Sequence, residues 1–278
     1  MDVVIGLGKA GCSMADLFAK YPQYKVYKVD VGLRGYKKDG VFAFPEQPTP
    51  EAYEANCPNM KSFFKDVRGD ILFIVCGAGN IASASLRVLE HLKHCNINIL
   101  YIKPDIDFLS KPSSMREQTV RGVFQEYARS GVFEKMYIID NKAVEGVVGE
   151  TPLDGYYEAL NGLVVSSLHM VNIYSHTKPI FGNGQPPIDS ARICTIGLVD
   201  LESDEDRVFC ELDYVRQKDY FYGVNQDCAR TDGGLKKRIT ESAKKRLDEF
   251  TKVTYSVYTT QYEDNHGFCV YYVSKIQA

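Results

Sequence analysis

The chain has 278 residues and a formal net charge of −3, with 45% apolar and 25% charged residues. This balance is close to the average of soluble globular proteins. It excludes a strongly basic surface of the kind that binds nucleic acid or anionic lipid. No apolar run reaches the roughly 20 residues that a membrane-spanning helix needs. The length suits one large domain or two smaller ones that share a core.

The eight cysteines are scattered along the chain, without a CxxC pair or a matched Cys/His spacing. We therefore predict no structural zinc or other metal site from them. The chain enters a strand-like run at once and has no charged leader segment, so we expect no signal peptide. Reduced thiols and a cytoplasmic location follow as expectations.

Short runs rich in Val, Ile and Tyr alternate with helical patterns in the first half of the chain. The predicted strands are Val3–Ile5, Lys25–Val29, Ile71–Val75, Ile97–Ile102 and Met136–Ile139. The predicted helices are Gly11–Lys20, Ala82–His94 and Ser113–Arg129. Strands that alternate with helices favour a parallel, doubly wound sheet. The segment Tyr36–Lys65 fits neither pattern, and its proline-rich part Pro45–Pro50 suggests a loop.

The second half opens with a predicted long helix from Pro152 to about Ser175, which carries an apolar stripe on nearly every turn. Proline and glycine then crowd Lys178–Pro187, which predicts a loop. The remaining predicted elements are strands Ala191–Val199 and Arg207–Tyr214, a helix Leu235–Phe250, and two paired strands, Val253–Tyr262 and Cys269–Ser274.

These elements predict an α/β fold in three parts. Residues 1–150 form a nucleotide-binding domain with a doubly wound, mostly parallel sheet. Residues 151–178 form a long central helix, and residues 179–278 form a smaller α/β C-terminal domain.

A first glycine loop, Gly6-Leu7-Gly8-Lys9-Ala10-Gly11, follows a strand and opens a helix. Glycines let the backbone approach a phosphate, whose charge is favoured by the free N–H groups at a helix N-terminus. Asp30 ends the next strand about twenty residues on, as in the dinucleotide fingerprint. Taken alone, this loop favours an NAD(P)-dependent oxidoreductase, and a glycine turn without a ligand is the simpler alternative.

A second glycine loop runs from Cys76 to Ser83 and follows the strand Ile71–Val75. Two strand–loop–helix turns on one sheet can face a single polyphosphate from two sides. A dinucleotide enzyme rarely needs this second cradle. An ordinary turn between strand and helix is the alternative for this loop on its own.

Together the two loops resemble those of the tubulin/FtsZ superfamily. The family's first loop reads GxGxAGxN or GQxGxQ, and its phosphate loop reads GGGTGTG or GGGTGSG. Here the second loop keeps only part of the pattern, because Asn80 stands where the family has threonine and Ala82 where it has threonine or serine. The resemblance implies nucleotide contacts from Gly8, Lys9, Gly11, Cys12, Ser13, Gly77, Ala78, Gly79, Asn80, Ile81, Ala82 and Ser83.

Three later segments resemble the same family in the same order. Lys103-Pro104 resembles its TKP turn, and Ile139-Asp140-Asn141-Lys142 resembles a turn whose asparagine contacts the guanine edge. Tyr157-Glu158-Ala159-Leu160-Asn161-Gly162-Leu163-Val164 resembles YxxLNxLV, in which the tyrosine stacks on guanine and the asparagine binds the base.

The chemistry of Tyr157 and Asn161 agrees with that role. Residues four apart share one helix face, so the flat ring and the amide project together. An amide carries both a donor and an acceptor, which suits guanine. The alternative is that Tyr157 belongs to the core and Asn161 is solvated.

The segment Phe181–Ser190 resembles the family's NxDxxD or NxDxxE loop, which completes the nucleotide site of the next subunit. Asp189 aligns with the last acid, whereas Pro186 takes the place of the earlier one. The resemblance implies Asp189 as the catalytic residue of a slow or absent GTP hydrolysis completed in trans. A turn-capping aspartate is the alternative.

The sequence therefore predicts a divergent phage- or plasmid-type member of the tubulin/FtsZ superfamily. The implied cofactor is GTP/GDP, and Mg²⁺ is a further candidate. The implied partner is the protein itself, in a head-to-tail polymer. Two alternatives stay open, namely the NAD(P)-dependent oxidoreductase and a family paralogue that neither polymerises nor hydrolyses and serves as a binding module.

Overall fold

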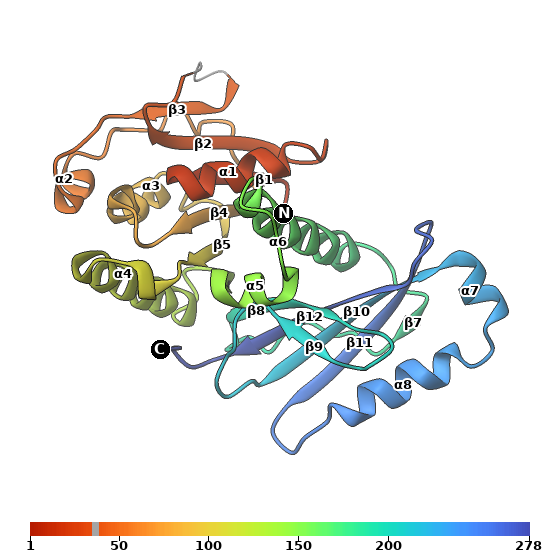
Figure 1. The fold of residues 1–278 in the computed structure, drawn as a ribbon. Helices are drawn as coiled ribbons and strands as arrows, with labels where there is room; N and C mark the ends of the chain where they lie inside the picture. The colour runs from red at the N-terminus through yellow and green to blue at the C-terminus, as the bar shows by residue number, and fades with distance from the viewer. Residues whose placement is uncertain (35–38) are drawn as a thin grey trace.

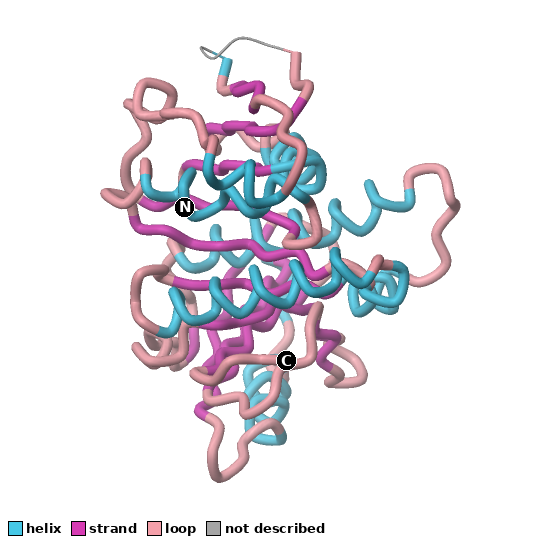
Figure 2. Tube along the Cα trace, turned by 90° about the vertical axis from the view of Figure 1, so that its left-hand side faces the viewer, coloured by secondary structure: helices cyan, strands magenta, loops and turns pink. Residues whose placement is uncertain are grey.

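One continuous sheet organises the computed structural model, which describes residues 1–34 and 39–278 (Figure 1). Within these residues twelve strands join in the order β3-β2-β1-β4-β5-β6-β8-β12-β10-β11-β7, with β9 beside β8. In Figure 2 the strands run one below the other from the top of the molecule to the bottom. The predicted α/β fold is confirmed.

The first six strands of the sheet are all parallel. They are β1 (Val3–Leu7), β2 (Lys25–Val31), β3 (Val41–Phe44), β4 (Asp70–Cys76), β5 (Asn96–Lys103) and β6 (Lys135–Asp140). All five predicted strands of this half are confirmed. β3 lies in the unassigned segment Tyr36–Lys65, as does the short helix α2 (Pro50–Ala55), while residues 36–38 of that segment lie outside the described part.

Helices cover both faces of this sheet, as a doubly wound fold requires. α1 (Gly8–Phe18), α5 (Asn141–Val148) and α6 (Tyr156–Ser175) pack on the face that carries Val4, Leu72 and Ile74. The helices α2, α3 (Ser85–Glu90) and α4 (Lys111–Arg129) pack on the face that carries Ile5 and Phe73. Alternate strand residues thus face opposite helical layers.

Two predicted helices have different limits in the structure. The segment predicted as one helix, Ala82–His94, is a 3-10 turn, η2 (Asn80–Ala84), followed by the short α3. The long helix predicted from Pro152 begins four residues later at Tyr156, because Gly155 precedes it in the left-handed region with φ +83°. The short helix α5 was not predicted.

The second half extends the sheet with mixed strand directions. Its elements are β7 (Phe181–Gly182), β8 (Ile193–Val199), β9 (Asp206–Val208), β10 (Gln217–Asn225), α7 (Gln226–Thr231), α8 (Leu235–Lys245), β11 (Lys252–Thr260) and β12 (His266–Val273). The predicted strand Arg207–Tyr214 is wrong beyond Val208, and the predicted helix Leu235–Phe250 ends at Lys245. β10 was missed.

The last two strands are not neighbours, contrary to the predicted pair. β10 lies between them, parallel to β11 and antiparallel to β12. The connection from β10 to β11 runs through α7 and α8, and parallel neighbours need such a crossover. Ile239 of α8 packs with Tyr220 and Tyr222 of β10 on the outer face of this part of the sheet.

The long helix α6 contacts both halves of the sheet (Figure 1). Its Leu168 is fully buried, and its Tyr174 ring stacks on Tyr258 of β11 with 4.4 Å between centroids. Tyr174 Oη also hydrogen-bonds His266 Nε2 at 2.6 Å. The domain limits drawn at residues 150 and 178 stay predictions. In the described part of the chain, no helix combines the length and apolar character needed to cross a membrane.

Candidate functional site

The carboxyl ends of the parallel strands bring the predicted loops to one edge of the sheet. β1 lies between β2 and β4, and the chain winds away in opposite directions on its two sides. Open α/β sheets bind ligands in the crevice at such a switch point. The first glycine loop leaves β1 here and the second leaves β4.

The first loop joins β1 to α1 without a spacer. The strand ends at Leu7 and the helix begins at Gly8, which has a positive φ of +73° that favours glycine. Leu7 occupies the N-cap position and supplies no side-chain hydrogen bond to the helix. The first N–H groups of α1 are therefore left for water or an anion.

Gly6 and Gly11 serve the packing of α1 against the sheet. A Cβ on Gly6 would overlap the carbonyl oxygen of Gly11, and one on Gly11 would lie 2.5 Å from the carbonyl oxygen of Ile74 in β4. Cys12 is buried next to them, and its Sγ donates to the carbonyl oxygen of Gly6 at 3.4 Å. Burial, followed by the nearby Asp30 carboxylate, raises the pKa of Cys12 to about 12, so its thiol is neutral.

The two loops touch each other directly. A Cβ on Gly8 would lie 3.0 Å from Cγ2 of Ile81, which is buried in η2. The N-cap position of η2 is Gly79, which again offers no side-chain cap. Asn80 is exposed, and its amide has no hydrogen-bond partner within the described ranges. The structure thus brings the two predicted loops together through Gly8 and Ile81.

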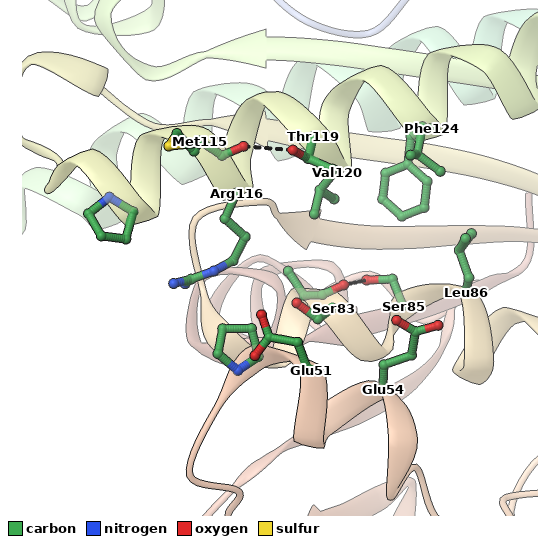
Figure 3. A pocket seen from close by; sticks show the side chains of 14 residues that line it. Glu51, Glu54, Ser83, Ser85, Leu86, Met115, Arg116, Thr119, Val120 and Phe124 are labelled. Carbon is green, nitrogen blue, oxygen red and sulfur yellow. Dashed lines mark hydrogen bonds between the residues drawn. The ribbon is translucent and has the colours of Figure 1, made fainter.

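Helix α4 supports the second loop from the other side. Arg116 Nη1 donates to the carbonyl oxygen of Ala78 at 2.7 Å. In Figure 3 the Arg116 side chain descends from α4 and turns to the left, with Glu51 below it and Ser83 to its right. These residues line a pocket of about 560 Å³ between α2, η2 and α4, to which the first loop contributes no residue. Ser83 therefore faces this pocket. Arg116 was not predicted, because it belongs to no recognisable motif in the sequence.

Helix α6 begins at the same edge of the sheet. Burial, then the Glu145 carboxylate, raises the pKa of Tyr156, and Asp105, which follows β5, adds to this rise. Tyr156 is the first residue of α6, and α6 packs against α1 and α5. The start of α6 therefore lies beside the turns that follow β5 and β6.

Tyr157 and Asn161 are both available to a ligand. Tyr157 is 69% exposed, so it is not the core residue of the alternative interpretation. Asn161 and Asn141 are half-buried, and neither amide has a hydrogen-bond partner in the part of the chain that the structure describes. Asn141 opens α5 directly after Asp140, whose carboxylate pairs with Lys103 at 3.2 Å.

Two further charged residues lie by the first loop. Asp30 is half-buried at the end of β2, and its Oδ1 accepts from the backbone N–H of Val31 at 2.8 Å. Burial raises the pKa of Asp30, while the hydrogen bond from the Val31 N–H and then the charge of the exposed Lys9 oppose that rise. One carboxylate oxygen of Asp30 is thus already engaged by the backbone.

Asp189 lies at the opposite edge of the sheet from the glycine loops. It precedes β8, whose first residue Ile193 pairs in parallel with Met136 near the start of β6. Because β6 and β8 are parallel and begin at the same level, Asp189 lies at the edge of the sheet where the parallel strands begin. Its carboxylate is exposed, and among the described residues it has no hydrogen-bond partner. Within one chain, Asp189 and the glycine loops do not meet.

This arrangement of sheet, loops and central helix defines the tubulin/FtsZ fold, and comparison with solved structures shows that fold directly. TubZ of Bacillus thuringiensis serovar israelensis, in a GTPγS-form protofilament, matches with a TM-score of 0.70 and 16% identity over 98% of this chain and 87% of that one. FtsZ from M. jannaschii matches with a TM-score of 0.64 and 11% identity over 98% and 87% of the two chains. CetZ2 from Haloferax volcanii matches with a TM-score of 0.66 and 12% identity over 97% and 92%. No family model and no curated protein matches the sequence.

The packing role of Gly11 predicts a specific loss of stability. Gly11→Ala places a methyl group against a backbone carbonyl that cannot move freely, so we expect a cost of about 1–3 kcal/mol in unfolding free energy. Urea unfolding without ligand measures it. Gly79→Ala is the matched control, because its Cβ would meet nothing closer than 3.8 Å. Equal stabilities for the two variants would contradict the packing role.

Proposed function

We propose that the chain binds GTP or GDP in the crevice at the carboxyl edge of its parallel strands. The observation that carries the proposal is the meeting of three elements at that edge. Two uncapped helix starts touch through Gly8 and Ile81, and α6 presents an exposed ring and an unpaired amide beside them.

The phosphates are assigned to the two glycine loops. The free N–H groups at the start of α1 favour an anion, and the exposed Lys9 adds a positive charge at the same place. Arg116 adds a second positive charge where it holds the carbonyl oxygen of Ala78. Mg²⁺ commonly binds through phosphates, water and one or two carboxylates. A site of that kind needs no cluster of protein ligands. Among the described residues, no group of three or more His, Cys, Asp or Glu side chains is placed to hold a metal ion.

The base is assigned to Tyr157, Asn161 and Asn141. An aromatic ring stacks on any base, whereas side-chain amides select by hydrogen bonds. Guanine offers O6 as an acceptor and N1 and N2 as donors, which suits two amides that have no other partner. The ring and the amide of α6 lie one helical turn apart and project on one face.

The partner we propose is a second copy of the chain, added head to tail. The glycine loops and Asp189 lie at opposite edges of the sheet, so one subunit can place its Asp189 at the nucleotide of the next. Heterologous contacts of this kind build open filaments. Phe108 and Leu153, in the turns beside the nucleotide edge, are 89% and 94% exposed, as suits a surface that a neighbour covers. The TubZ and CetZ2 neighbours are themselves described as protofilaments.

Hydrolysis is proposed to be slow. Asp189 can orient an attacking water by its charge and position. The second acid of the resembling loop is replaced by Pro186, so this orientation depends on one carboxylate.

Nucleotide-dependent assembly tests the proposal as a whole. The purified protein should bind GTP but not NAD, and GTP with Mg²⁺ should raise light scattering through filaments visible by electron microscopy. Retention of NAD without GTP affinity would favour the oxidoreductase built on Asp30. GTP binding with a flat scattering trace, in both sodium and potassium buffers, would favour a binding module.

The base assignment predicts a measurable loss at Tyr157. Tyr157→Ala removes a stacking surface worth about 1–3 kcal/mol, so the Kd for GTP should rise by a factor between roughly 5 and 150. Tyr157→Phe is the control, because it keeps the ring and should bind nearly as wild type. Titration with a fluorescent GTP analogue measures both. An unchanged affinity in folded Tyr157→Ala would remove this residue from the site.

The trans assignment predicts complementation between two defective variants. Asp189→Ala should keep its GTP affinity and lose turnover, because its own nucleotide loops are intact. Mixed with Tyr157→Ala, which still supplies Asp189, it should recover turnover above the sum of the separate proteins. Phosphate release measures the rate, and Glu205→Ala is the control for loss of an exposed carboxylate. Undiminished turnover in Asp189→Ala would refute the role.

A further inference from the structure

A buried polar chain lies directly beneath the second glycine loop. Glu117 is fully buried on α4, and Arg121, one turn further, is 7% exposed. Arg121 Nε donates to Glu117 Oε1 at 2.8 Å. Tyr101 Oη, from β5, donates to the same Oε1 and to the backbone carbonyl oxygen of Glu117, each at 3.1 Å. Charges this deeply buried are rare, and they persist only where partners are held in place.

The upper end of this chain sets the position of the loop. A Cβ on Gly77 would overlap Tyr101 Oη, so the backbone of the loop rests on that hydroxyl. Arg116, the neighbour of Glu117 on α4, holds the carbonyl oxygen of Ala78. Tyr101 of β5 and Arg116 of α4 therefore hold two successive residues of the loop.

The lower end of this buried polar chain is formed by a residue from the C-terminal half of the protein. Gln277 follows β12, is buried, and its carbonyl oxygen accepts from Arg121 Nη1 at 3.1 Å and from Gln125 Nε2 at 3.0 Å. The Gln277 N–H donates to Gln125 Oε1 at 2.7 Å. The Gln277 side chain accepts from the Asp213 N–H at 2.6 Å, which holds the segment in place.

Because Glu117 has few hydrogen-bond partners, the buried polar chain depends on how Gln277 holds Arg121 at its lower end. Glu117 Oε2 is buried without a hydrogen-bond partner among the described residues, so the carboxylate depends on Arg121 and Tyr101 through Oε1. Breaking a buried ion pair leaves an uncompensated charge. If Gln277 no longer holds Arg121, the guanidinium gains freedom to turn toward water, and Glu117 and Tyr101 must readjust beneath Gly77.

We propose that the buried chain Gln277–Arg121–Glu117–Tyr101 positions the second glycine loop, so that docking of Gln277 on α4 sets nucleotide affinity. Tyr101, Glu117 and Arg121 are positioning residues, because they act on the ligand only through the backbone of the loop. The effect on affinity rests on the proposed nucleotide site. The contact of Tyr101 with Gly77 of the loop does not depend on that site.

A double-mutant cycle tests the upper contact without any nucleotide. Gly77→Ala should lower the urea midpoint of the wild type strongly, since its methyl group meets the Tyr101 hydroxyl. In Tyr101→Phe that atom is gone, and the nearest remaining ring atom, Cζ, lies 2.9 Å from the Cβ position. The same substitution should then shift the midpoint by about half as much or less, because the effects of contacting residues are not additive. Gly79→Ala is the matched control and should shift both backgrounds equally. Additive shifts for Gly77→Ala would overturn the contact.

A second cycle tests the lower end. Gln277→Ala keeps the backbone groups that contact α4 but removes the side chain that accepts from the Asp213 N–H, so those backbone groups are no longer held in place. We expect it to weaken GTP and GDP binding by about fivefold or more, the usual lower range of coupling between sites. Lys275→Ala, on the exposed residue two positions earlier, should not. In Tyr101→Phe the effect of Gln277→Ala should largely disappear, whereas a merely structural role would give the same loss in both backgrounds.

The two cycles separate this proposal from the proposed function. If the wild type binds neither GTP nor GDP, the proposed function fails, and the same variants are then compared by urea midpoint. Coupling of Gln277→Ala to Tyr101→Phe in those midpoints would retain the positioning chain. Additive midpoints would overturn it.

Discussion

The close approach of α1 to the sheet is the constraint on which the rest of this structure depends. Gly6 and Gly11 let helix backbone meet strand backbone, where any side chain would force them apart. The helix therefore starts directly at the end of β1, with its free N–H groups facing the crevice between β1 and β4. Because α6 packs against α1, the same contact determines where Tyr157 and Asn161 lie relative to the loops.

The elements that could be predicted are those whose signal is local. The buried strands of the first half are apolar on both faces, and a continuous apolar run identifies them. The strand β10 was not predicted because the polar residues Gln217 and Asp219 interrupt its apolar pattern. Asp219 is nonetheless buried, and its Oδ1 accepts from Gln217 and from Thr254 of the neighbouring β11. Of these two partners Thr254 lies 35 residues away in the sequence, so no local pattern shows that it satisfies the buried carboxylate.

The same distinction between local signals and long-range contacts applies to the candidate site. Gly8, Asn80 and the Tyr157–Asn161 pair were predicted from short segments at strand or helix ends, and the structure places those segments at one edge of the sheet. The reason for a glycine at position 77 could not be predicted, because it is the Tyr101 hydroxyl of the next strand. Arg116 was missed for the same reason, since its role depends on how α4 packs beside the second loop.

The altered second loop gains a physical explanation from these contacts. A glycine-rich loop adapts its backbone to the phosphates at an entropic cost, because each glycine loses more freedom on ordering than other residues do. Here three of those glycines are absent, since Ala78, Ile81 and Ser83 take their places. The loop is instead held from below by Tyr101 and from the side by Arg116. A loop held in this way needs less ordering when a ligand arrives, and preorganisation of this kind favours affinity. Its shape, in return, depends on α4 and on every group that holds α4 in place. The replacement of glycines in the loop and the buried ion pair beneath it are therefore two aspects of one structural solution.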